Sequence, residues 1–158
     1  MRLQVRRFGP DDWESARAAR LASVRDGFGE DSDFYREQAA LDPAAWRVVL
    51  AEHVRFGAVD DGDRPVGTAC WRPGPDGDGQ LYGMWVAAGF RGTGLADALV
   101  EAVDAAAREH GSATLSLRVE PGNARALAFY ARTGFVAEPS PGPGLLVMTR
   151  PVVARPVS

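Results

Sequence analysis

A glycine-rich turn with an arginine at its edge is the part of this sequence best suited to binding chemistry. The segment W-V-A-A-G-F-R-G-T-G-L-A-D-A-L-V, residues 85–100, runs from an apolar strand through that turn into an amphipathic helix. Backbone N–H groups converge at such a turn, and the positive end of the helix dipole lies at the same place. The segment therefore predicts a site for an anion such as phosphate, with Arg91 beside it.

The two commonest phosphate-binding loops do not match this turn. A P-loop needs a Gly-Lys-Ser/Thr sequence, and all 18 basic residues of the chain are arginines. The dinucleotide fingerprint G-x-G-x-x-G is incomplete, and no acidic residue ends a following strand in the right place. The absence of lysine also excludes Schiff-base chemistry. The turn can therefore be an anion-binding turn of another class. Its glycines could instead serve only the tight packing of the strand against the helix.

A second segment, N-A-R-A-L-A-F-Y-A-R-T-G-F at 123–135, places two polar side chains on one predicted helix. Asn123 and Tyr130 are seven residues apart, which is two helical turns, so they share a face at about 10 Å separation. Asn123 is in position to cap the helix, and Tyr130 taken alone could be a core aromatic with a satisfied hydroxyl.

Together these two segments resemble the GNAT family, the GCN5-related N-acetyltransferases. The family's pyrophosphate motif, Q/R-x-x-G-x-G/A, and its second hallmark, N-x-x-A-x-x-x-Y-x-x-x-G-F, occur here at the expected separation, the second over residues 123–135. The order of predicted elements agrees over about residues 2–150. The residues that match the first motif are Arg91, Gly92, Thr93, Gly94, Leu95 and Ala96.

The resemblance implies acetyl-CoA as co-substrate and no metal. Backbone amides of residues 91–96 would hold its pyrophosphate, while the strand end at Met84, Trp85 and Val86 would pair with the pantetheine arm. In the family this strand usually carries a bulge that separates it from the next strand. One of its amides, assigned here to Met84, would donate to the acetyl oxygen as negative charge develops there.

The resemblance also assigns roles to the two polar residues of the later helix. Asn123 corresponds to a family residue near the pantetheine, and Tyr130 to the residue whose hydroxyl lies by the thioester sulfur. A phenol with a pKa near 10 can donate a proton to a departing thiolate, so Tyr130 is the expected general acid. The amine attacks directly in a ternary complex, and Cys70 therefore needs no nucleophilic role.

The proton acceptor is where this sequence departs from many relatives. An amine with a pKa near 10 is mostly ammonium at pH 7 and must lose a proton before it attacks. Many family members have a glutamate on the central strand, whereas G-Q-L-Y-G-M-W-V at 79–86 has no carboxylate. Gln80 or Tyr82 could hold a water that carries the proton away, and Glu120 is a weaker candidate. The base stays unassigned, and a non-catalytic acyl-CoA sensor of the same fold stays open.

The acceptor amine is less constrained by the sequence than the acetyl donor. Tyr82 and Trp71 are candidate acceptor contacts, and the loops at 26–42, 73–79 and 139–144 would set the specificity. A small-molecule amine and a peptide or protein amine both remain possible, as do longer acyl groups on the donor. A homodimer is compatible with the sequence.

Composition excludes several other classes of protein. The net charge of −3 leaves no broad basic surface for nucleic acid. One cysteine excludes an internal disulfide, and with two histidines it makes no zinc site. No apolar run approaches the roughly 20 residues of a membrane span, and the first residues alternate apolar and polar rather than forming a signal peptide. A cytoplasmic protein without nucleic-acid or membrane partners is the expectation.

The elements that must position these residues follow an α/β order, with one domain over residues 1–150 and a tail over 151–158. Helical spacing marks a first helix in which Arg20 is the one polar side chain among apolar ones, followed by a loop at 26–33. The expected sheet is mixed, mostly antiparallel and flanked by helices, and the resemblance adds a separation between its fourth and fifth strands. Strands are expected at about 2–7, 54–60, 65–72, 81–86, 114–119 and 145–149, with another after Phe135, and further helices at 34–41, 43–53, 94–109 and 123–132.

Overall fold

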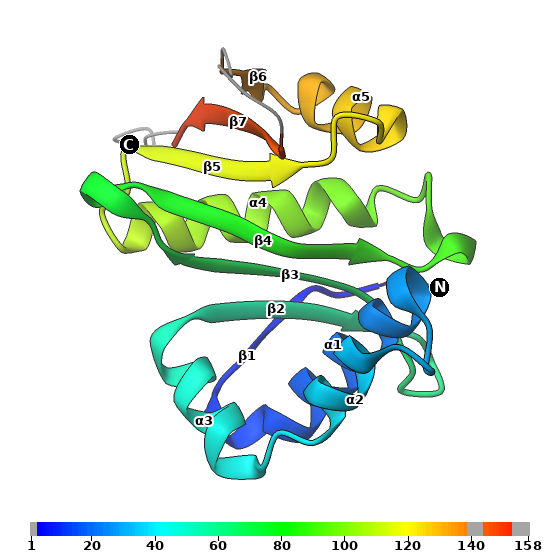
Figure 1. Ribbon diagram of the computed structural model, residues 1–158. Coiled ribbons are helices and arrows are strands. Elements are labelled where there is room, and N and C mark those ends of the chain that lie inside the picture. The colour runs from blue at the N-terminus through cyan, green and yellow to red at the C-terminus, as the bar shows by residue number, and fades with distance from the viewer. Residues whose placement is uncertain (1–2, 139–143, 153–158) are drawn as a thin grey trace.

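A computed structural model describes residues 3–138 and 144–152 of the chain (Figure 1). Its sheet has seven strands in the order β1-β2-β3-β4-β5-β7-β6. The strands are β1 (Arg6–Phe8), β2 (Val54–Val59), β3 (Pro65–Pro73), β4 (Gly79–Val86), β5 (Thr114–Val119), β6 (Val136–Ala137) and β7 (Leu146–Pro151). The helices are α1 (Trp13–Phe28), α2 (Asp33–Ala39), α3 (Pro43–Glu52), α4 (Leu95–Glu109) and α5 (Ala124–Arg132), with 3₁₀ turns at Pro10–Asp12, Pro75–Gly77 and Ala88–Phe90.

The sheet is mixed and mostly antiparallel, as expected. Every neighbouring pair of strands is antiparallel except β4 and β5, which are parallel. Helix α1 packs mainly against β3, α2 packs against α1, and α3 lies beside β2, whereas α5 lies at the other end of the sheet near β5, β6 and β7 (Figure 1).

Helices α4 and α1 cover opposite faces of the central strands. A Cβ added to Gly67 of β3 would meet Leu95 of α4 at 3.0 Å, whereas Cys70, an odd number of residues further on, points toward α1. Successive side chains of a strand alternate between faces, so the two contacts define the two layers. The helix predicted to be amphipathic is α4, and its apolar face of Leu95, Leu99, Val103 and Ala106 is buried at the centre of the main core.

A β-bulge interrupts β4 one residue after Tyr82. Trp85 pairs with Thr68 of β3 and Tyr82 pairs with Cys70, so Gly83 and Met84 together oppose the single residue between. Gly83 has φ +62°, a conformation that side chains other than glycine rarely adopt. The bulge that the family resemblance implied is therefore present, and it re-aims the strand just before the glycine turn.

The parallel strands β4 and β5 pair only at the start of β4. The paired residues are Gly79 with Leu115 and Gln80 with Ser116, and the remaining length of β4 has no partner in β5. The expected separation between the fourth and fifth strands is confirmed, and it leaves the end of β4 open on one edge.

Three predicted boundaries were wrong. The first strand is only β1, because the chain pairs with β2 no earlier than Arg6. Helix α1 continues into the predicted loop at 26–33 and ends at Phe28, where Gly29 with φ +88° donates its N–H to the carbonyl of Arg25. Strand β7 extends to Pro151, which pairs with Thr114, so the strand includes the first residue assigned to the tail.

Parts of two predicted segments lie outside the described residues. These are most of the loop at 139–144 and residues 153–158 of the tail. Among the residues that the structure describes, no helix is long and apolar enough to cross a membrane. No group of three or more His, Cys, Asp or Glu side chains within that same part of the chain could hold a metal ion.

Candidate active site

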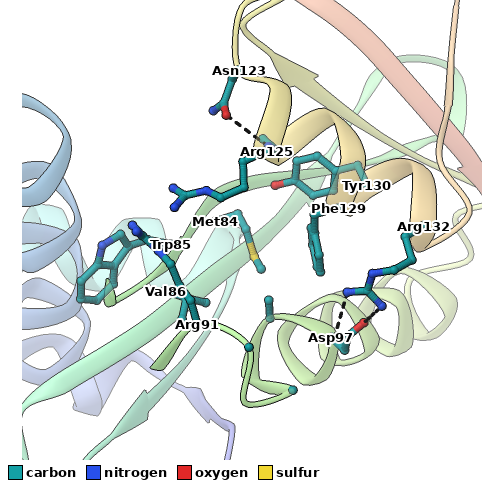
Figure 2. Close-up of a pocket in the computed structure, with 14 residues that line it drawn as sticks. Met84, Trp85, Val86, Arg91, Asp97, Asn123, Arg125, Phe129, Tyr130 and Arg132 are labelled. Atoms are coloured by element: carbon teal, nitrogen blue, oxygen red, sulfur yellow. Dashed lines mark hydrogen bonds and ion pairs between the residues drawn. The ribbon is translucent and has the colours of Figure 1, made fainter. Parts of the chain in front are cut away.

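A pocket of about 350 Å³ lies where the end of β4, the glycine turn, α4 and α5 meet (Figure 2). The two segments singled out by the sequence therefore line one cavity. Its lining residues are Met84, Trp85 and Val86 from β4; Arg91, Gly92 and Gly94 from the turn; Ala96 and Asp97 from α4; and Asn123, Arg125, Ala126, Phe129, Tyr130 and Arg132 from α5 and its cap.

The turn owes its shape to two glycines with left-handed backbone. Gly92 has φ +77° and Gly94 has φ +89°, and a Cβ added to either would meet nothing within 4 Å. Glycine is thus required there by the backbone conformation rather than by crowding. Gly94 is also the N-cap of α4, so the N–H groups of the first helical turn open toward this region.

Two side chains of the predicted motif, those of Thr93 and Leu95, support the turn instead of lining the pocket. Thr93 donates its hydroxyl to the carbonyl of Phe90 at 2.5 Å, which ties the turn to the preceding 3₁₀ turn. Leu95 is buried in the main core beneath the turn. The side chains of Thr93 and Leu95 line a neighbouring hollow rather than the pocket itself.

The pocket carries more positive than negative charge. Arg91 lies at its edge, with its guanidinium 4.0 Å from the carboxylate of Asp26, which also accepts a hydrogen bond from Trp85 Nε1 at 2.9 Å. Arg125 extends from α5 over Met84 (Figure 2). Because the lining carboxylate, Asp97, already pairs with Arg132 at 3.2 Å, the local charge favours an anionic ligand.

Tyr130 is buried, and its hydroxyl points into the pocket. Its side chain is 8% exposed and lies against the rings of Phe129 and Phe135 at centroid distances of 5.3 and 5.7 Å. The hydroxyl is directed toward Met84 and Arg125 (Figure 2), and no residue of the described chain hydrogen-bonds to it. Burial raises the pKa of Tyr130 to about 12, so the phenol keeps its proton throughout the neutral range.

Asn123 caps α5 as the sequence predicted. Its Oδ1 accepts a hydrogen bond from the backbone N–H of Ala126 at 3.1 Å, and the side chain stays exposed at the pocket rim. Met84 lies across the pocket, in the bulge, where the register leaves it without a partner in β3. Asn123, Tyr130 and Met84 therefore face one space from two sides.

The two predicted acceptor contacts do not line this pocket. Trp71 is 3% exposed and packs in the main core against His110, with ring centroids 4.3 Å apart, so its position does not suit contact with an acceptor. Tyr82 is half-buried on the opposite face of β4. Glu120 is exposed just after β5.

Tyr82 forms a contact that no sequence pattern signalled. Its hydroxyl lies 2.6 Å from Nδ1 of His53, and the guanidinium of Arg72 lies 4.6 Å from its ring centre. Burial raises the pKa of Tyr82 to about 12. Burial first, and then the charge of Arg72, lower the pKa of His53, so the imidazole is mainly neutral at pH 7.

The match to known proteins agrees with this geometry. A family model described as the Acetyltransferase (GNAT) family matches residues 16–135, and the chain belongs to this family of acetyltransferases. A stretch of 72 residues is 42% identical to an uncharacterized N-acetyltransferase of Mycobacterium tuberculosis. That match covers 46% of this chain and 46% of the relative, so it spans just under half of either protein.

Solved structures share the fold over nearly the whole chain. The PaiA N-acetyltransferase of Thermoplasma acidophilum, in complex with coenzyme A, is 16% identical with a TM-score of 0.73, covering 96% of this chain and 99% of that one. A GNAT-family acetyltransferase of Staphylococcus aureus is 18% identical with a TM-score of 0.71, covering 96% and 100%. At these identities the likeness establishes the fold.

Proposed function

We propose that this protein moves an acetyl group from acetyl-CoA to a primary amine by direct attack in a ternary complex. The observation that carries the proposal is the convergence of three features on one pocket: the glycine turn, the bulge at Met84 and the hydroxyl of Tyr130. The family supplies the general activity, and the pocket chemistry supports the acetyl donor.

The residues of the pocket fit a CoA thioester, which would supply the acetyl group in activated form. The amides of residues 91–96 and the guanidinium of Arg91 suit a pyrophosphate, because they combine N–H donors, the helix dipole and a fixed positive charge. Backbone at Trp85 and Val86 is available to the pantetheine arm along the edge that β5 leaves open. Asn123 lies at the rim beside that path.

Two donors would act on the charges that develop during transfer. The N–H of Met84 is proposed to donate to the acetyl oxygen, a role that the bulge favours because it removes Met84 from the β3 ladder. Tyr130 is proposed to donate its hydroxyl proton to the departing thiolate. Because no residue of the described chain hydrogen-bonds to the Tyr130 hydroxyl, its proton is available for donation to the thiolate.

The base that deprotonates the amine is the open element of this mechanism. Strand β4 has no carboxylate, and Gln80 accepts a hydrogen bond from Arg72 at 3.0 Å. We therefore retain a water held near Tyr82 as the proposed proton route. The neutral imidazole of His53, in contact with the Tyr82 hydroxyl, supports that route.

The lack of a strand carboxylate favours one alternative, an acyl-CoA-binding sensor without turnover. The two functions separate in a thiol-release assay with acetyl-CoA over a diverse panel of amines. Release of CoA thiol with at least one amine supports the transferase. Stabilisation of the protein by acetyl-CoA without thiol release from any amine supports the sensor, and stabilisation by ATP but not by CoA would contradict both.

We also propose the class of acceptor and the place where the protein acts. The acceptor would be a small-molecule amine or the amine of a peptide or protein, and the protein would act in the cytoplasm without nucleic-acid or membrane partners. Light scattering in solution would show whether it forms a homodimer. Propionyl-CoA and longer acyl-CoAs in the same assay would define the donor range.

A further inference from the structure

Three arginine side chains gather on the face of the sheet that α1 covers, and we call Arg20, Arg55 and Arg72 the cationic cluster. Arg55 pairs with Cys70 across β2 and β3, and Arg72 follows Cys70 by two residues, so both arginines share one face. Arg20 enters from α1, where its Nη1 would lie 4.0 Å from a Cβ added to Gly83 of the bulge.

The charges of the cationic cluster act on one another. Burial is the largest cause that lowers the pKa of Arg20, and the charge of Arg55 is the next. Burial is the largest cause that lowers the pKa of His53. The charges of Arg72 and Arg55 lower it further and that of Glu52 raises it, which places the imidazole beside the same cluster. Like charges this close are costly unless an opposite charge offsets them.

No carboxylate of the described chain forms an ion pair with any member of the cationic cluster. The partners are neutral: Gln38 accepts from Arg20 at 3.1 Å and Thr68 accepts from Arg55 at 3.3 Å. Arg72 donates to Gln80, as described above. Arg55 is buried and Arg20 and Arg72 are half-buried, and the described residues give none of the three the carboxylate partner that a buried arginine normally has.

Arg55 shows the deficit most clearly. It is 4% exposed, and its Nε has no hydrogen-bond partner among the described residues. Arg150 is buried to a similar degree and also has an unpartnered Nε, but its Nη2 donates to the carboxylate of Asp104 at 2.9 Å. The same fold thus provides a carboxylate for one buried arginine and none for the other.

The cationic cluster lies across β4 from the pocket. Tyr82, which contacts Arg72, precedes Met84 by two residues. Because an extended strand rises about 3.3 Å per residue and the bulge shortens it, the two Cα atoms are at most about 7 Å apart. Trp85 lies between the pocket and the cationic cluster. It lines the pocket, and it pairs with Thr68 of β3, whose hydroxyl accepts the hydrogen bond from Arg55. A small molecule can span this distance.

From the unbalanced charge and its position, we propose that the cationic cluster binds an oxyanion of the acceptor, so that the acceptor is an amine that also carries a carboxylate or a phosphate. This inference rests on the proposed acetyl transfer. The amine nitrogen forms a bond to the acetyl carbon and the C–S bond breaks. One proton ends on the CoA thiol, the second proton of the ammonium goes to solvent, and the oxyanion is unchanged.

The test compares matched acceptors in the thiol-release assay. Glycine, 3-aminopropanoate and 4-aminobutanoate vary the spacing of amine and carboxylate, and their amides remove only the charge. Aminoethyl phosphate compared with ethanolamine tests phosphate. We expect at least one anionic amine to exceed its neutral match by tenfold or more in kcat/KM, because a guanidinium pairs strongly with an oxyanion.

Variants assign that preference to the cationic cluster. Arg72→Gln is expected to lower kcat/KM for the preferred anionic amine about tenfold more than for its amide, with the KM for acetyl-CoA unchanged. Arg64→Gln makes the same charge change on the exposed β2–β3 hairpin and is expected to change none of these values. Circular dichroism melting of each variant shows whether it is folded. Arg55→Gln tests a second arginine of the cationic cluster in the same way.

The outcomes separate the two proposals. Thiol release without preference for anionic amines, or an equal loss on acids and amides in Arg72→Gln, overturns the inference and leaves acetyl transfer intact. No thiol release from any amine overturns the proposed function and this inference with it.

Discussion

At the scale of single residues, Tyr130 differs from the other two tyrosines of the chain. The hydroxyl of Tyr35 accepts a hydrogen bond from Arg25, and that of Tyr82 contacts His53. The hydroxyl of Tyr130 has no such partner in the described chain and faces the pocket. Because this hydroxyl opens to the pocket and has no protein partner there, it is available to a bound ligand, which supports a role for Tyr130 toward the thioester.

Replacement of Tyr130 by phenylalanine tests that role. If the phenol protonates the departing thiolate, Tyr130→Phe is expected to lower kcat roughly 100-fold or more while KM for acetyl-CoA changes little. Steady-state thiol release measures both values. Tyr35→Phe makes the same chemical change on α2, outside the pocket, and equal kcat values for the two variants would remove Tyr130 from the mechanism.

The raised pKa of Tyr130 also predicts a pH dependence of stability. Between pH 10 and 12 the unfolded chain releases the phenolic proton while the native state keeps it, so the free energy of unfolding falls as the pH rises. At about 1.4 kcal/mol per pKa unit, Tyr130 accounts for a fall of about 2–3 kcal/mol. Urea unfolding at pH 9 to 12 should show a smaller fall in Tyr130→Phe, and identical slopes in both proteins would contradict this.

At the scale of elements, the glycine turn and the bulge shape the pocket through backbone conformation. Gly83, Gly92 and Gly94 all have positive φ, and they occupy the two segments that border the cavity, one on each side of Val86. Because these conformations are strained for other residues, the sequence places glycine where the backbone, rather than a side chain, must present its N–H groups.

Gly94→Ala is the element-scale test. A methyl group at φ +89° costs roughly 1–2 kcal/mol or shifts the turn, so we expect KM for acetyl-CoA to rise about tenfold or more. Gly89→Ala is the matched control, since Gly89 lies just before the same turn, lacks a positive φ and has nothing within 4 Å of an added Cβ. Equal KM values for the two variants would show that the turn does not bind the donor.

At the scale of the whole molecule, a buried ionic network joins α4 to β7. Asp104 is 1% exposed and accepts hydrogen bonds from Arg150 at 2.9 Å and from Arg108 at 3.1 Å. Arg150 also donates to the carbonyl of Thr133 at 2.7 Å, just after α5. The network therefore fixes α5, and with it Tyr130, relative to α4 and the glycine turn.

Removing one charge of that network should destabilise the whole fold. Asp104→Asn leaves Arg150 buried with only the exposed carboxylate of Glu101, 4.0 Å away, as an opposite charge, which costs about 3–5 kcal/mol of unfolding free energy. Asp97→Asn makes the same change in an exposed pair on the same helix, and its cost should stay below about 1 kcal/mol. Urea unfolding measures both, and similar losses in the two variants would refute a structural role for the network.

The features that the sequence predicted correctly are those that depend on residues close together in the chain. The apolar face of α4 and the Asn123 cap follow from helical spacing, whereas the proximity of the two motifs was implied by the resemblance to the GNAT family. The end of α1 was not predicted correctly, because Gly27 is tolerated within the helix and Gly29 supplies the C-terminal signal instead.

Contacts between segments that are distant in the chain could not be predicted from the sequence. His53 and Tyr82 are 29 residues apart, and only the pairing of β2, β3 and β4 brings them together. The burial of Asp104 likewise depends on Arg150, which comes from β7. Arg20 gave one available signal, since a lone polar residue on an apolar helix face indicates a buried polar partner or ligand.

Transfer of the acetyl group itself is the most direct test of the central claim. Acetyl-CoA carrying ¹³C in the acetyl group, incubated with the protein and the amine panel, is followed by mass spectrometry of the amines and by thiol release. We predict that at least one amine gains one labelled acetyl group for each thiol released, and that this yield falls about 100-fold in Tyr130→Phe. Tight binding of acetyl-CoA with no labelled amine and no thiol release would contradict the account.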